Sequence, residues 1–553
     1  MSLTYKKVIS QLFPETLETP EELEKKYPLR ILPNNAVVTR FAPSPTGFIH
    51  IGGVYIAVIG KNITQKSGGT YFIRIEDTDQ KRKVDDSETQ FDKTFQYFKI
   101  ESDESNQNSI YGPYIQSERS NIYLSYVKKL MEDDRAYPCF CTKEMLEEQT
   151  KKQIEAKVDI GYYGKWAQCS RLTENEIENK LKLGIPYVVR FRCNGTDSMT
   201  TFEDKIRGTV RLKNNINDVV ILKSSDNALP LPTYHLAHAV DDHLMRVNLI
   251  LRADEWLSSV PLHFQLFDAL GFERIPYAHI APIMKLDGTS KRKLSKRKDP
   301  EASVGYYMEN GYPAEAVIAY LKGLANSDLS NLPIAECLNA EIQIDKMPKS
   351  GALLDLDKLN HISSNYIAAL NSDKITTNIQ NWACEYDSKL NEVISNNCSY
   401  TSKVINTDRI TNGKIRKDLI KWSDFTNLYG YFFNEYFVPV TESTNEIYEK
   451  YTAETVKNVL STFQSLYQDN IGNDEWMNVI QKVAENGNFA VNNQEYKASP
   501  EKFNGKLSDA IKIVRIVLTG IGSGLSLHEV CNTLGYKMVN DRISNFIISN
   551  CDY

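Results

Sequence analysis

Residues 36–53 read Ala36-Val37-Val38-Thr39-Arg40-Phe41-Ala42-Pro43-Ser44-Pro45-Thr46-Gly47-Phe48-Ile49-His50-Ile51-Gly52-Gly53. The apolar run up to Phe41 predicts a buried strand, and the two prolines that follow predict a loop, because proline cannot continue a sheet ladder. From Phe48 to about Lys66 the pattern predicts a helix that glycines end, and Tyr71-Phe72-Ile73-Arg74-Ile75 predicts a second strand. Strand, loop, helix and strand form one βαβ unit, which predicts a parallel sheet.

The start of the predicted helix has the residues that a phosphate site needs. The free N–H groups and the dipole of a helix start favour an anion, and glycines allow a nucleotide to approach the backbone closely. His50 can donate a hydrogen bond to a phosphate oxygen. For one histidine alone, an ordinary strand-to-helix turn with a satisfied side chain is the more common explanation.

Length and composition indicate a globular protein of several domains. The chain has 553 residues, of which 41% are apolar and 25% charged, which predicts about three to five domains. No apolar run approaches the roughly 18 residues of a membrane span. The acidic residues among positions 1–35 fit neither a secretory signal nor a mitochondrial presequence, and Thr19-Pro20-Glu21-Glu22 predicts a capped helix start instead. We therefore expect a cytoplasmic protein without a membrane part, whose nine cysteines are mostly reduced thiols.

A second candidate motif, which is basic, lies about 240 residues after the first. It contains Lys293-Leu294-Ser295-Lys296-Arg297, within a run from Lys291 to Lys298. Lysines on such a loop can neutralise charge that develops on a pyrophosphate leaving group. Alone, the segment is equally typical of a solvated loop or of a patch that contacts RNA, and the net charge of −6 does not exclude a local basic face.

The rest of the chain divides by composition. Residues 118–215 are rich in charge, and Thr173-Glu174-Asn175-Glu176 predicts a capping box there. After about residue 380 the apolar residues follow helical spacing, as in Val456, Val459, Leu460 and Phe463. Ser526-Leu527-His528-Glu529 predicts another capping box, and Gly535 the end of its helix. The C-terminal third is therefore predicted to be all-α.

Together the two motifs resemble the two signatures of class I aminoacyl-tRNA synthetases. The Arg-Phe-Ala-Pro-Ser-Pro-Thr-Gly segment, followed by Arg74-Ile75-Glu76-Asp77-Thr78-Asp79, resembles the glutamyl-tRNA synthetase family in particular. The resemblance continues through Pro232–Ala237, Val240–His243, Leu251–Leu257 and Asp355–Asn360. It is strong to about residue 365 and faint in the helical third.

The resemblance implies a fold and a division into domains. The fold expected is α/β, a Rossmann-type catalytic domain with an inserted acceptor-binding domain, followed by an all-α anticodon-binding region. The expected parts are an N-terminal extension at 1–35, the first catalytic half at 36–117, the acceptor-stem-binding insert at 118–217, the second catalytic half at 218–275, a stem-contact domain with the basic loop at 276–375, and the anticodon-binding region at 376–553.

The resemblance also implies the reaction and its residues. ATP, as its Mg²⁺ complex, activates L-glutamate to glutamyl-adenylate, and the 3′ end of the tRNA then takes the glutamyl group. The implied glutamate-binding residues are Arg40, Ala42, Ser44, Glu76, Tyr234, His238 and Arg252. The implied ATP-binding residues are Thr46, His50, Gly52, Glu255, Trp256, Leu294 and Lys296, and the implied catalytic residues are His50, Lys293 and Lys296.

Elementary chemistry agrees with these assignments. A carboxylate substrate calls for arginine, and its ammonium group for an acid such as Glu76. The sequence departs from the general class pattern at Gly53, Leu294 and Arg297, all familiar in bacterial members. His238 stands where many relatives have asparagine, which leaves the contacts at that position open.

Cys139-Phe140-Cys141 with Cys169 resembles a zinc knuckle found in part of this family. A structural zinc site takes four ligands, so the fourth is either Tyr163 or missing. Three reduced thiols without Zn²⁺ are the alternative.

The resemblance implies a monomeric enzyme that acts on tRNA-Glu, and leaves open whether tRNA-Gln is also a substrate. The alternatives are a glutaminyl-tRNA synthetase and a non-catalytic tRNA-binding paralogue. The former usually has Pro-Glu-Pro-Asn-Gly at the first motif. The latter would not need both ATP motifs, and both are intact here. A truncated relative that glutamylates a tRNA base lacks the residues after 380.

Overall fold

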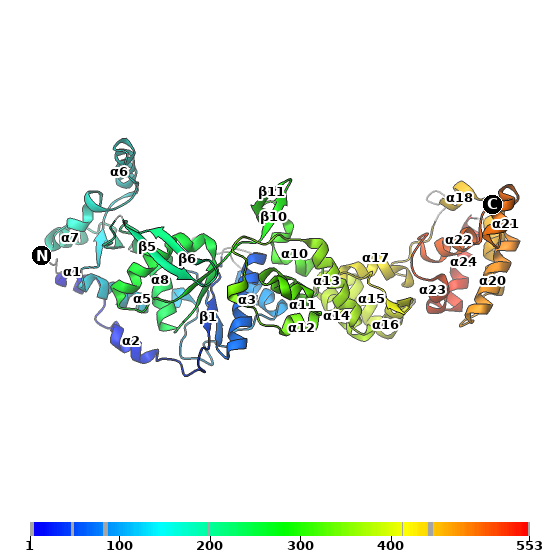
Figure 1. Cartoon of the computed structure of the whole chain (residues 1–553), viewed down its shortest axis with the longest axis horizontal. Coiled ribbons are helices and arrows are strands. Elements are labelled where there is room, and N and C mark those ends of the chain that lie inside the picture. Colours follow the sequence, from blue (N-terminus) through cyan, green and yellow to red (C-terminus); the bar gives the residue numbers. More distant parts are fainter. Residues whose placement is uncertain are drawn as a thin grey trace. The chain divides into compact units, whose positions relative to one another are not determined.

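The computed structural model describes residues 5–45, 49–80, 87–196, 198–411, 413–440 and 446–550. The chain forms two compact units, Met1–Met308 with Val317–Leu356, and Glu309–Ala316 with Asp357–Tyr553. The first unit combines strands and helices, and the second is built mainly of helices (Figure 1). The predicted α/β fold with a helical C-terminal part is confirmed. Among the helices of the described ranges, none is long and apolar enough to cross a membrane.

The predicted βαβ unit is present. It consists of β1 (Val38–Phe41), α3 (Ile51–Ser67) and β2 (Thr70–Ile73), and the strands are parallel with Val38 opposite Thr70 and Phe41 opposite Ile73. Gly68 ends α3 in the left-handed conformation, with φ of 68°. A Cβ at Gly69 would lie 1.8 Å from the carbonyl oxygen of Val37. Glycine is therefore required where the helix returns to the sheet.

A four-stranded sheet lies beside β1. Its order is β6 (Gly208–Lys213), β5 (Met199–Asp204), β9 (Tyr277–Ile280) and β8 (Ile250–Ala253). Strands β8 and β9 are parallel, and β5 joins β9 in parallel at Asp204 opposite Tyr277. The backbone N–H groups of Asn248 and Leu249 donate to the carbonyl oxygen of Val38. Strands from either side of the insertion thus meet at one place.

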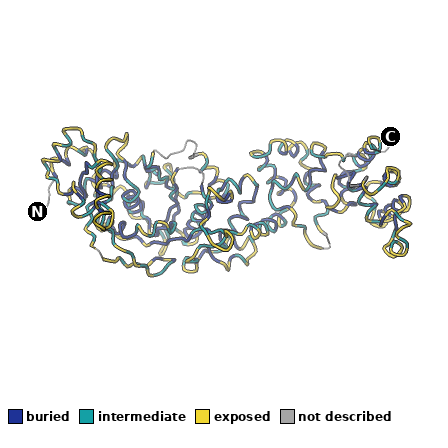
Figure 2. The backbone as a smooth tube through the Cα atoms, turned by 90° about the horizontal axis from the view of Figure 1, so that it is seen from above, coloured by how far each residue is buried: buried dark blue, intermediate teal, exposed yellow. Residues whose placement is uncertain are grey.

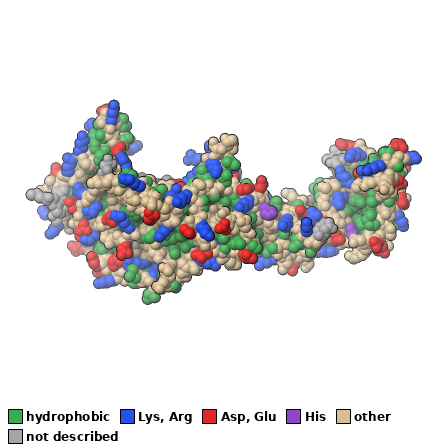
Figure 3. Space-filling view, in the orientation of Figure 1, with side chains coloured by type: hydrophobic (Ala, Val, Ile, Leu, Met, Phe, Trp, Pro, Cys, Tyr) green, Lys and Arg blue, Asp and Glu red, His purple; other side chains and the backbone are tan. Residues whose placement is uncertain are grey.

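Two strands of the expected insert at 118–217 form an antiparallel sheet with a strand at the start of the expected second catalytic half. Its order is β3 (Ala136–Cys139), β4 (Val188–Phe191) and β7 (Val220–Leu222). The predicted capping box forms between Thr173 and Glu176 at the start of α7 (Glu174–Lys182). Helix α6 (Lys143–Glu155) projects at the upper left of Figure 1, and Figure 3 shows Lys and Arg side chains along this projection. The remaining helices of this part and of the catalytic halves are α4 (Ser87–Tyr97), α5 (Ser120–Glu132), α8 (Tyr234–Leu244) and α9 (Val260–Leu270).

Residues 5–35 form an N-terminal strap over this unit. Thr19 caps the start of α2 (Pro20–Lys26) as predicted, and it forms a capping box with Glu22. The strap and α1 (Lys6–Leu12) bury Tyr5, Val8, Phe13, Leu23 and Tyr27 in the core shared with α5 and α8. A hydrogen bond and an ion pair join the strap to the end of α8 and its turn: Glu24 lies 2.5 Å from His243 and 2.6 Å from Arg246. The extension is therefore part of the folded unit.

The basic loop follows a hairpin of β10 (Met284–Asp287) and β11 (Ser290–Lys293). The helices that come next are α10 (Val304–Glu309), α11 (Ala314–Ala325) and α12 (Ile334–Asn339). Asn62 on α3 donates to the carbonyl oxygen of Ala340 and accepts from the N–H of Ile342. The helix that begins at His50 is thus tied to the segment after the basic loop.

The second unit is helical around one core. Val456, Val459, Leu460 and Phe463 on α19 are fully buried, as their spacing predicts, and Figure 2 shows buried turns alternating with exposed ones along these helices. Helix α23 ends at Gly535 as expected, but Ser526 makes no side-chain cap, so the predicted capping box is wrong. The other helices are α13 (Leu356–Ala369), α14 (Ser372–Tyr386), α15 (Ser388–Asn396), α16 (Cys398–Asn406), α17 (Phe425–Tyr429), α18 (Glu446–Lys450), α19 (Ala453–Leu466), α20 (Asn473–Asn486), α21 (Asn493–Ala498), α22 (Leu507–Thr519), α23 (Leu527–Leu534) and α24 (Tyr536–Asn550).

Candidate active site

The start of α3 is built around His50, which caps the helix. Its Nδ1 accepts a hydrogen bond of 2.9 Å from the backbone N–H of Gly52. A Cβ at position 52 would lie 3.1 Å from that nitrogen, so glycine lets the ring close over the helix start. Because Nδ1 accepts, the neutral ring carries its proton on Nε2, which is buried and makes no hydrogen bond of good geometry, with the Leu294 main chain nearby. A donor is therefore available where a phosphate would meet the helix.

The basic loop is held in shape by Asp299. This carboxylate accepts two hydrogen bonds from Arg292, at 2.6 and 2.7 Å, and one of 2.9 Å from the N–H of Ser295. Arg292 holds the pKa of Asp299 well below its usual value. Leu294 is buried while Lys293 and Lys296 on either side are exposed. The loop thus presents its lysines from an anchored base.

The structure brings the two motifs together. Lys293 lies 2.6 Å from Glu255. Burial lowers the pKa of His50, the Leu294 main chain raises it, and Lys296 and Lys293 lower it further. These effects require the loop to lie beside the helix start, although about 240 residues separate them. The site residue Thr46 lies outside the described residues.

Two arginines of the first catalytic half share one carboxylate. Asp242 accepts from Arg40 Nε and from Arg74 Nη1, each at 2.7 Å, and all three side chains are buried. Burial opposes ionisation of Asp242, but Arg40 and Arg74 hold its pKa well below the usual value. Arg40 also donates to the carbonyl oxygen of Leu251. Its guanidinium is therefore oriented and paired before any substrate arrives.

Glu76 and His238 face the same group of charges. Arg74 donates to Glu76 at 3.1 Å, and burial raises the pKa of Glu76 against the lowering influence of Arg74 and Arg40. Both nitrogens of His238 are occupied, since Nδ1 lies 2.8 Å from Asp242 and Nε2 3.0 Å from the Tyr277 hydroxyl. Burial lowers the pKa of His238 to about 3, so this ring is neutral and faces protein groups.

Arg252 is buried at the end of β8. It donates to His279 at 3.0 Å, to the Trp256 carbonyl oxygen at 3.1 Å and to the Tyr234 hydroxyl at 3.4 Å, and lies 3.2 Å from His263. The Tyr234 ring packs on Trp256 with centroids 4.2 Å apart. Burial raises the pKa of Tyr234, Arg252 and Arg40 lower it, and Glu76 raises it. Tyr234, Arg252, Glu76 and Arg40 of the predicted glutamate set therefore lie near one another, next to Trp256 of the predicted ATP set.

The remaining predicted residues lie on the loop after β1, where Ala42 is half-buried and Ser44 exposed. The N–H of Glu76 donates to the carbonyl oxygen of Pro43, which joins this loop to the segment after β2. The residues that hold the site together received no role from the sequence: Arg74, Asp204, Asp242, His263 and His279. Arg74 and Asp242 belong to motifs that the resemblance covers, which is the signal that could have indicated them.

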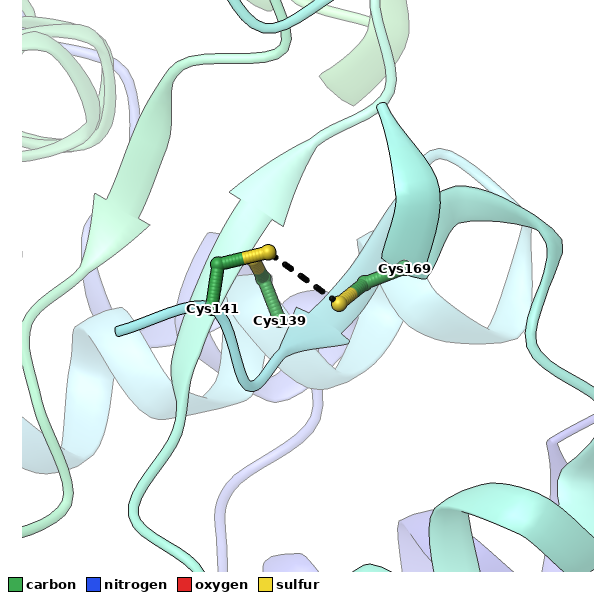
Figure 4. A group of neighbouring side chains, drawn as sticks. All are labelled: Cys139, Cys141 and Cys169. Atoms are coloured by element: carbon green, nitrogen blue, oxygen red, sulfur yellow. Dashed lines mark hydrogen bonds between the residues drawn. The ribbon is translucent and has the colours of Figure 1, made fainter. Parts of the chain in front are cut away.

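The cysteines form a compact group of their own (Figure 4). The sulfur atoms of Cys139, Cys141 and Cys169 all lie within 4.8 Å of one another, and those of Cys141 and Cys169 are 3.6 Å apart. Ligands of tetrahedral zinc at a Zn–S distance of about 2.3 Å would be about 3.8 Å apart. Tyr163 lies outside the group, because its hydroxyl donates to Asp159. The Tyr162 hydroxyl is the oxygen at this place, 3.4 Å from Cys139 and 3.3 Å from Cys141.

Comparison with known proteins agrees with this geometry. The family described as tRNA synthetases class I (E and Q), catalytic domain, matches residues 36–361. The glutamate–tRNA ligase of Clostridium perfringens strain SM101 is 39% identical over 99% of this chain and 100% of its own length. The chain belongs to the glutamate–tRNA ligases. That of Sorangium cellulosum is 34% identical over 96% of this chain and 98% of its own length.

The fold of the family extends over nearly the whole chain. A crystal structure of a glutamate tRNA ligase from Elizabethkingia meningosepticum in complex with its amino acid is 26% identical, with a TM-score of 0.74. It covers 93% of this chain and 100% of its own. As a glutamate–tRNA ligase of class I, the chain is an aminoacyl-tRNA ligase whose family uses ATP.

Proposed function

We propose that the protein activates L-glutamate with ATP to glutamyl-adenylate and transfers the glutamyl group to the 3′ end of tRNA-Glu. The observation that carries this proposal is that His50 and Lys293–Lys296 meet beside a buried group of arginines and carboxylates. In this reaction the glutamate carboxylate attacks the α-phosphate, and the terminal ribose hydroxyl of the tRNA then attacks the anhydride. No protein nucleophile is needed, so positioning and charge stabilisation carry the catalysis.

The glutamate pocket is proposed to consist of Arg40, Ala42, Ser44, Glu76, Tyr234 and Arg252. The arginines supply donors for carboxylates, and Glu76 an acceptor for the ammonium group. His238 has no free ring nitrogen. We therefore assign it the role of orienting Asp242 and, through it, Arg40.

ATP with its Mg²⁺ is proposed to bind between the start of α3 and the basic loop. The contributing residues are Thr46, His50, Gly52, Glu255, Trp256, Leu294 and Lys296. His50 Nε2 supplies a buried donor, and Lys293 and Lys296 supply positive charge for the pyrophosphate. Trp256 lies between the two pockets, because Tyr234 packs on it.

A structural Zn²⁺ is proposed at Cys139, Cys141, Cys169 and Tyr162. The spacing of the sulfur atoms fits tetrahedral coordination, and the oxygen of Tyr162 supplies the fourth donor. When bound, the ion would join the end of β3 to the turn at Gln168–Arg171. The ligand set differs from the sequence prediction only in Tyr162 replacing Tyr163.

We propose that the insert at 118–217 binds the acceptor stem of the tRNA, that residues 276–375 contact the stem, and that residues 376–553 bind the anticodon. We propose a monomeric, cytoplasmic enzyme. Whether tRNA-Gln is also charged depends on anticodon contacts in the helical part, and aminoacylation of both purified tRNAs decides it.

Aminoacylation of tRNA-Glu with labelled glutamate, compared with glutamine, tests the proposed activity. We expect ATP-dependent charging with glutamate alone. Lys296→Ala should lower kcat more than it raises the KM for ATP, because charge on the pyrophosphate builds mainly in the transition state. Lys66→Ala, an exposed lysine at the end of α3, is the control. Charging with glutamine, or no charging at all, would instead support the glutaminyl or non-catalytic alternatives.

A further inference from the structure

Arg252 differs from the other buried arginines of the catalytic part in its partners. Arg40 and Arg74 each lie 2.7 Å from Asp242, and Arg119 lies 2.7 Å from Asp241. Within the described residues, Arg252 has no carboxylate at ion-pair distance. Its partners are His279, His263, the Tyr234 hydroxyl and the Trp256 carbonyl oxygen. A guanidinium that is 6% exposed is thus surrounded by neutral groups.

The hydrogen bonds determine where the protons of these histidines lie. A guanidinium only donates, so His279 must accept at Nε2 and carry its proton on Nδ1. That nitrogen lies 2.6 Å from Asp204 Oδ2, which accepts the proton's hydrogen bond. By the same argument His263 accepts at Nδ1, and its Nε2–H donates to His235 at 3.0 Å. Both rings are therefore neutral, each in one tautomer.

The surroundings keep both rings uncharged. Burial lowers the pKa of His279, although Asp204 raises it, and burial lowers the pKa of His263 well below its usual value, with further lowering by His238 and Arg252. His235 has a pKa lowered to about 4, again by burial. At neutral pH the two partners of Arg252 thus orient it without cancelling its charge.

The charge that remains matches the proposed substrate. Around the pocket, Arg40 and Arg74 are paired with Asp242 and Glu76, whereas the Asp204 carboxylate is separated from Arg252 by the His279 ring, so Arg252 keeps a positive charge with no carboxylate in direct contact. Glutamate carries one net negative charge, whereas glutamine carries none. A carboxylate in place of either histidine would neutralise Arg252 and repel the substrate.

We propose that His263 and His279 are positioning residues that present Arg252 to a substrate carboxylate while no protein carboxylate contacts it directly, and that Asp204 sets the tautomer of His279. This inference rests on the proposed role of Arg252 in glutamate binding. It adds residues from β5, β9 and α9 to the specificity of the pocket. Of the five guanidinium N–H groups, one on Nη2 has no partner among the described residues and one on Nη1 is held weakly by Tyr234 at 3.4 Å, so these two are the ones proposed to bind the ligand.

The test compares variants that keep or remove the accepting nitrogen. Glutamine places its oxygen where the His279 Nε2 lies, and asparagine where the His263 Nδ1 lies. We expect His279→Leu and His263→Leu to raise the KM for L-glutamate about tenfold or more, because a buried charged donor loses its acceptor. His279→Gln and His263→Asn should restore most of the affinity, and the KM for ATP should stay nearly constant in all four. His361→Leu, at an exposed histidine of α13, is the matched control.

Asp204→Asn tests the same inference without a change of volume. Asparagine keeps the oxygen that accepts from the N–H groups of Ile206 and Arg207, so the fold should be retained even if a leucine variant fails to fold. Its amide NH₂ would face Nδ1 and move the His279 proton to Nε2, donor against donor with Arg252. We expect a raised KM for L-glutamate in Asp204→Asn that does not appear when the change is made in the His279→Gln background.

Arg252→Gln separates the two possible failures. If Arg252→Gln raises the KM for L-glutamate and the leucine and Asp204→Asn variants do not, the positioning role is overturned and the proposed pocket stands. If Arg252→Gln leaves that KM unchanged, the proposed pocket itself is overturned.

Discussion

At the scale of single residues, Asp242 connects most of the charges in the pocket. It accepts from Arg40 and Arg74 and lies 2.8 Å from His238. Asp242 is the nearest carboxylate to both arginines, since the second carboxylate contact of Arg74, to Glu76, is longer at 3.1 Å. One carboxylate thus orients the two arginines that come from adjacent strand ends.

Asp242→Asn should therefore destabilise the first unit as well as the pocket. Leaving a buried guanidinium without its carboxylate costs about 3–5 kcal/mol. We expect a lower unfolding midpoint and a large loss of kcat/KM for glutamate. Asp133→Asn removes an exposed pair with Lys129, worth about 0–1 kcal/mol, and should change neither. Equal midpoints for the two variants would contradict the importance of Asp242.

Glu76 predicts a pH dependence of glutamate binding. Burial raises its pKa, against the opposing influence of Arg74 and Arg40. An ionised Glu76 is needed for the substrate ammonium group, so binding is present above this raised pKa and is lost as pH falls through it. The pocket histidines have pKa values that burial lowers below the usual value.

We therefore expect kcat/KM for glutamate to fall on the acidic side at a higher pH than an ordinary glutamate would give. The measurement is a pH profile between about 5 and 8, repeated with Glu76→Gln. The variant should be weak and lose this limb of the profile. An identical limb in Glu76→Gln would assign it to another group.

At the scale of elements, helix α8 supplies four groups from one face. Tyr234, His238, Asp241 and Asp242 follow the spacing i, i+4, i+7 and i+8, which places them on the same side of a helix. The helix ends in a turn at Arg246 with φ of 59°. The strap holds this end through Glu24, so a segment far from the pocket in sequence fixes the helix that lines it.

At the cysteine group, two adjacent tyrosines offer a matched pair of variants. Tyr162→Phe removes the oxygen that lies beside Cys139 and Cys141, whereas Tyr163→Phe removes one that donates to Asp159. We expect the purified protein to carry close to one equivalent of zinc. Tyr162→Phe should lose it to a chelator faster than the unchanged protein, and Tyr163→Phe should not.

Metal analysis and the rate of chelation check this expectation. The protein must be purified without any chelator for the metal analysis. If such protein contained no zinc, the group would be three reduced thiols and not a metal site. Equal rates for the two tyrosine variants would restrict the ligands to the cysteines.

At the scale of the whole molecule, every residue proposed for glutamate and ATP belongs to the first compact unit. The region proposed for the anticodon, residues 376–553, belongs to the second. Any dependence of activation on the anticodon is therefore a coupling free energy between separate sites. The family resemblance implies a dependence of activation on tRNA.

We expect glutamate-dependent exchange of pyrophosphate into ATP to require tRNA-Glu. The measurement is exchange with and without tRNA, with a tRNA for another amino acid as control. Rapid exchange in the absence of RNA would show that the pocket is productive on its own.

Local structure was largely predictable, because local chemistry determines it. The strand at Val38–Phe41, the helix from Ile51 and the helix caps at Thr19 and Thr173 all follow from apolar spacing, glycines and capping residues. Ser526 shows the limit, since the same pattern forms no cap there. Contacts over long separations, such as those of Asp204 with His279, depend on how strands are ordered in a sheet. The meeting of His50 with the basic loop came only from the family resemblance.

The N-terminal strap has a consequence for synthesis on the ribosome. Its acid Glu24 pairs with His243 and Arg246, which follow about 220 residues later in the chain. At about 5–20 residues per second, that delay is on the order of 10–40 s. Tyr5, Val8 and Phe13 enter a core that also contains side chains of α5 and α8, so this core is complete only after α8 has been made. Until then the nascent chain exposes apolar side chains of the strap, and this is where a chaperone would engage it.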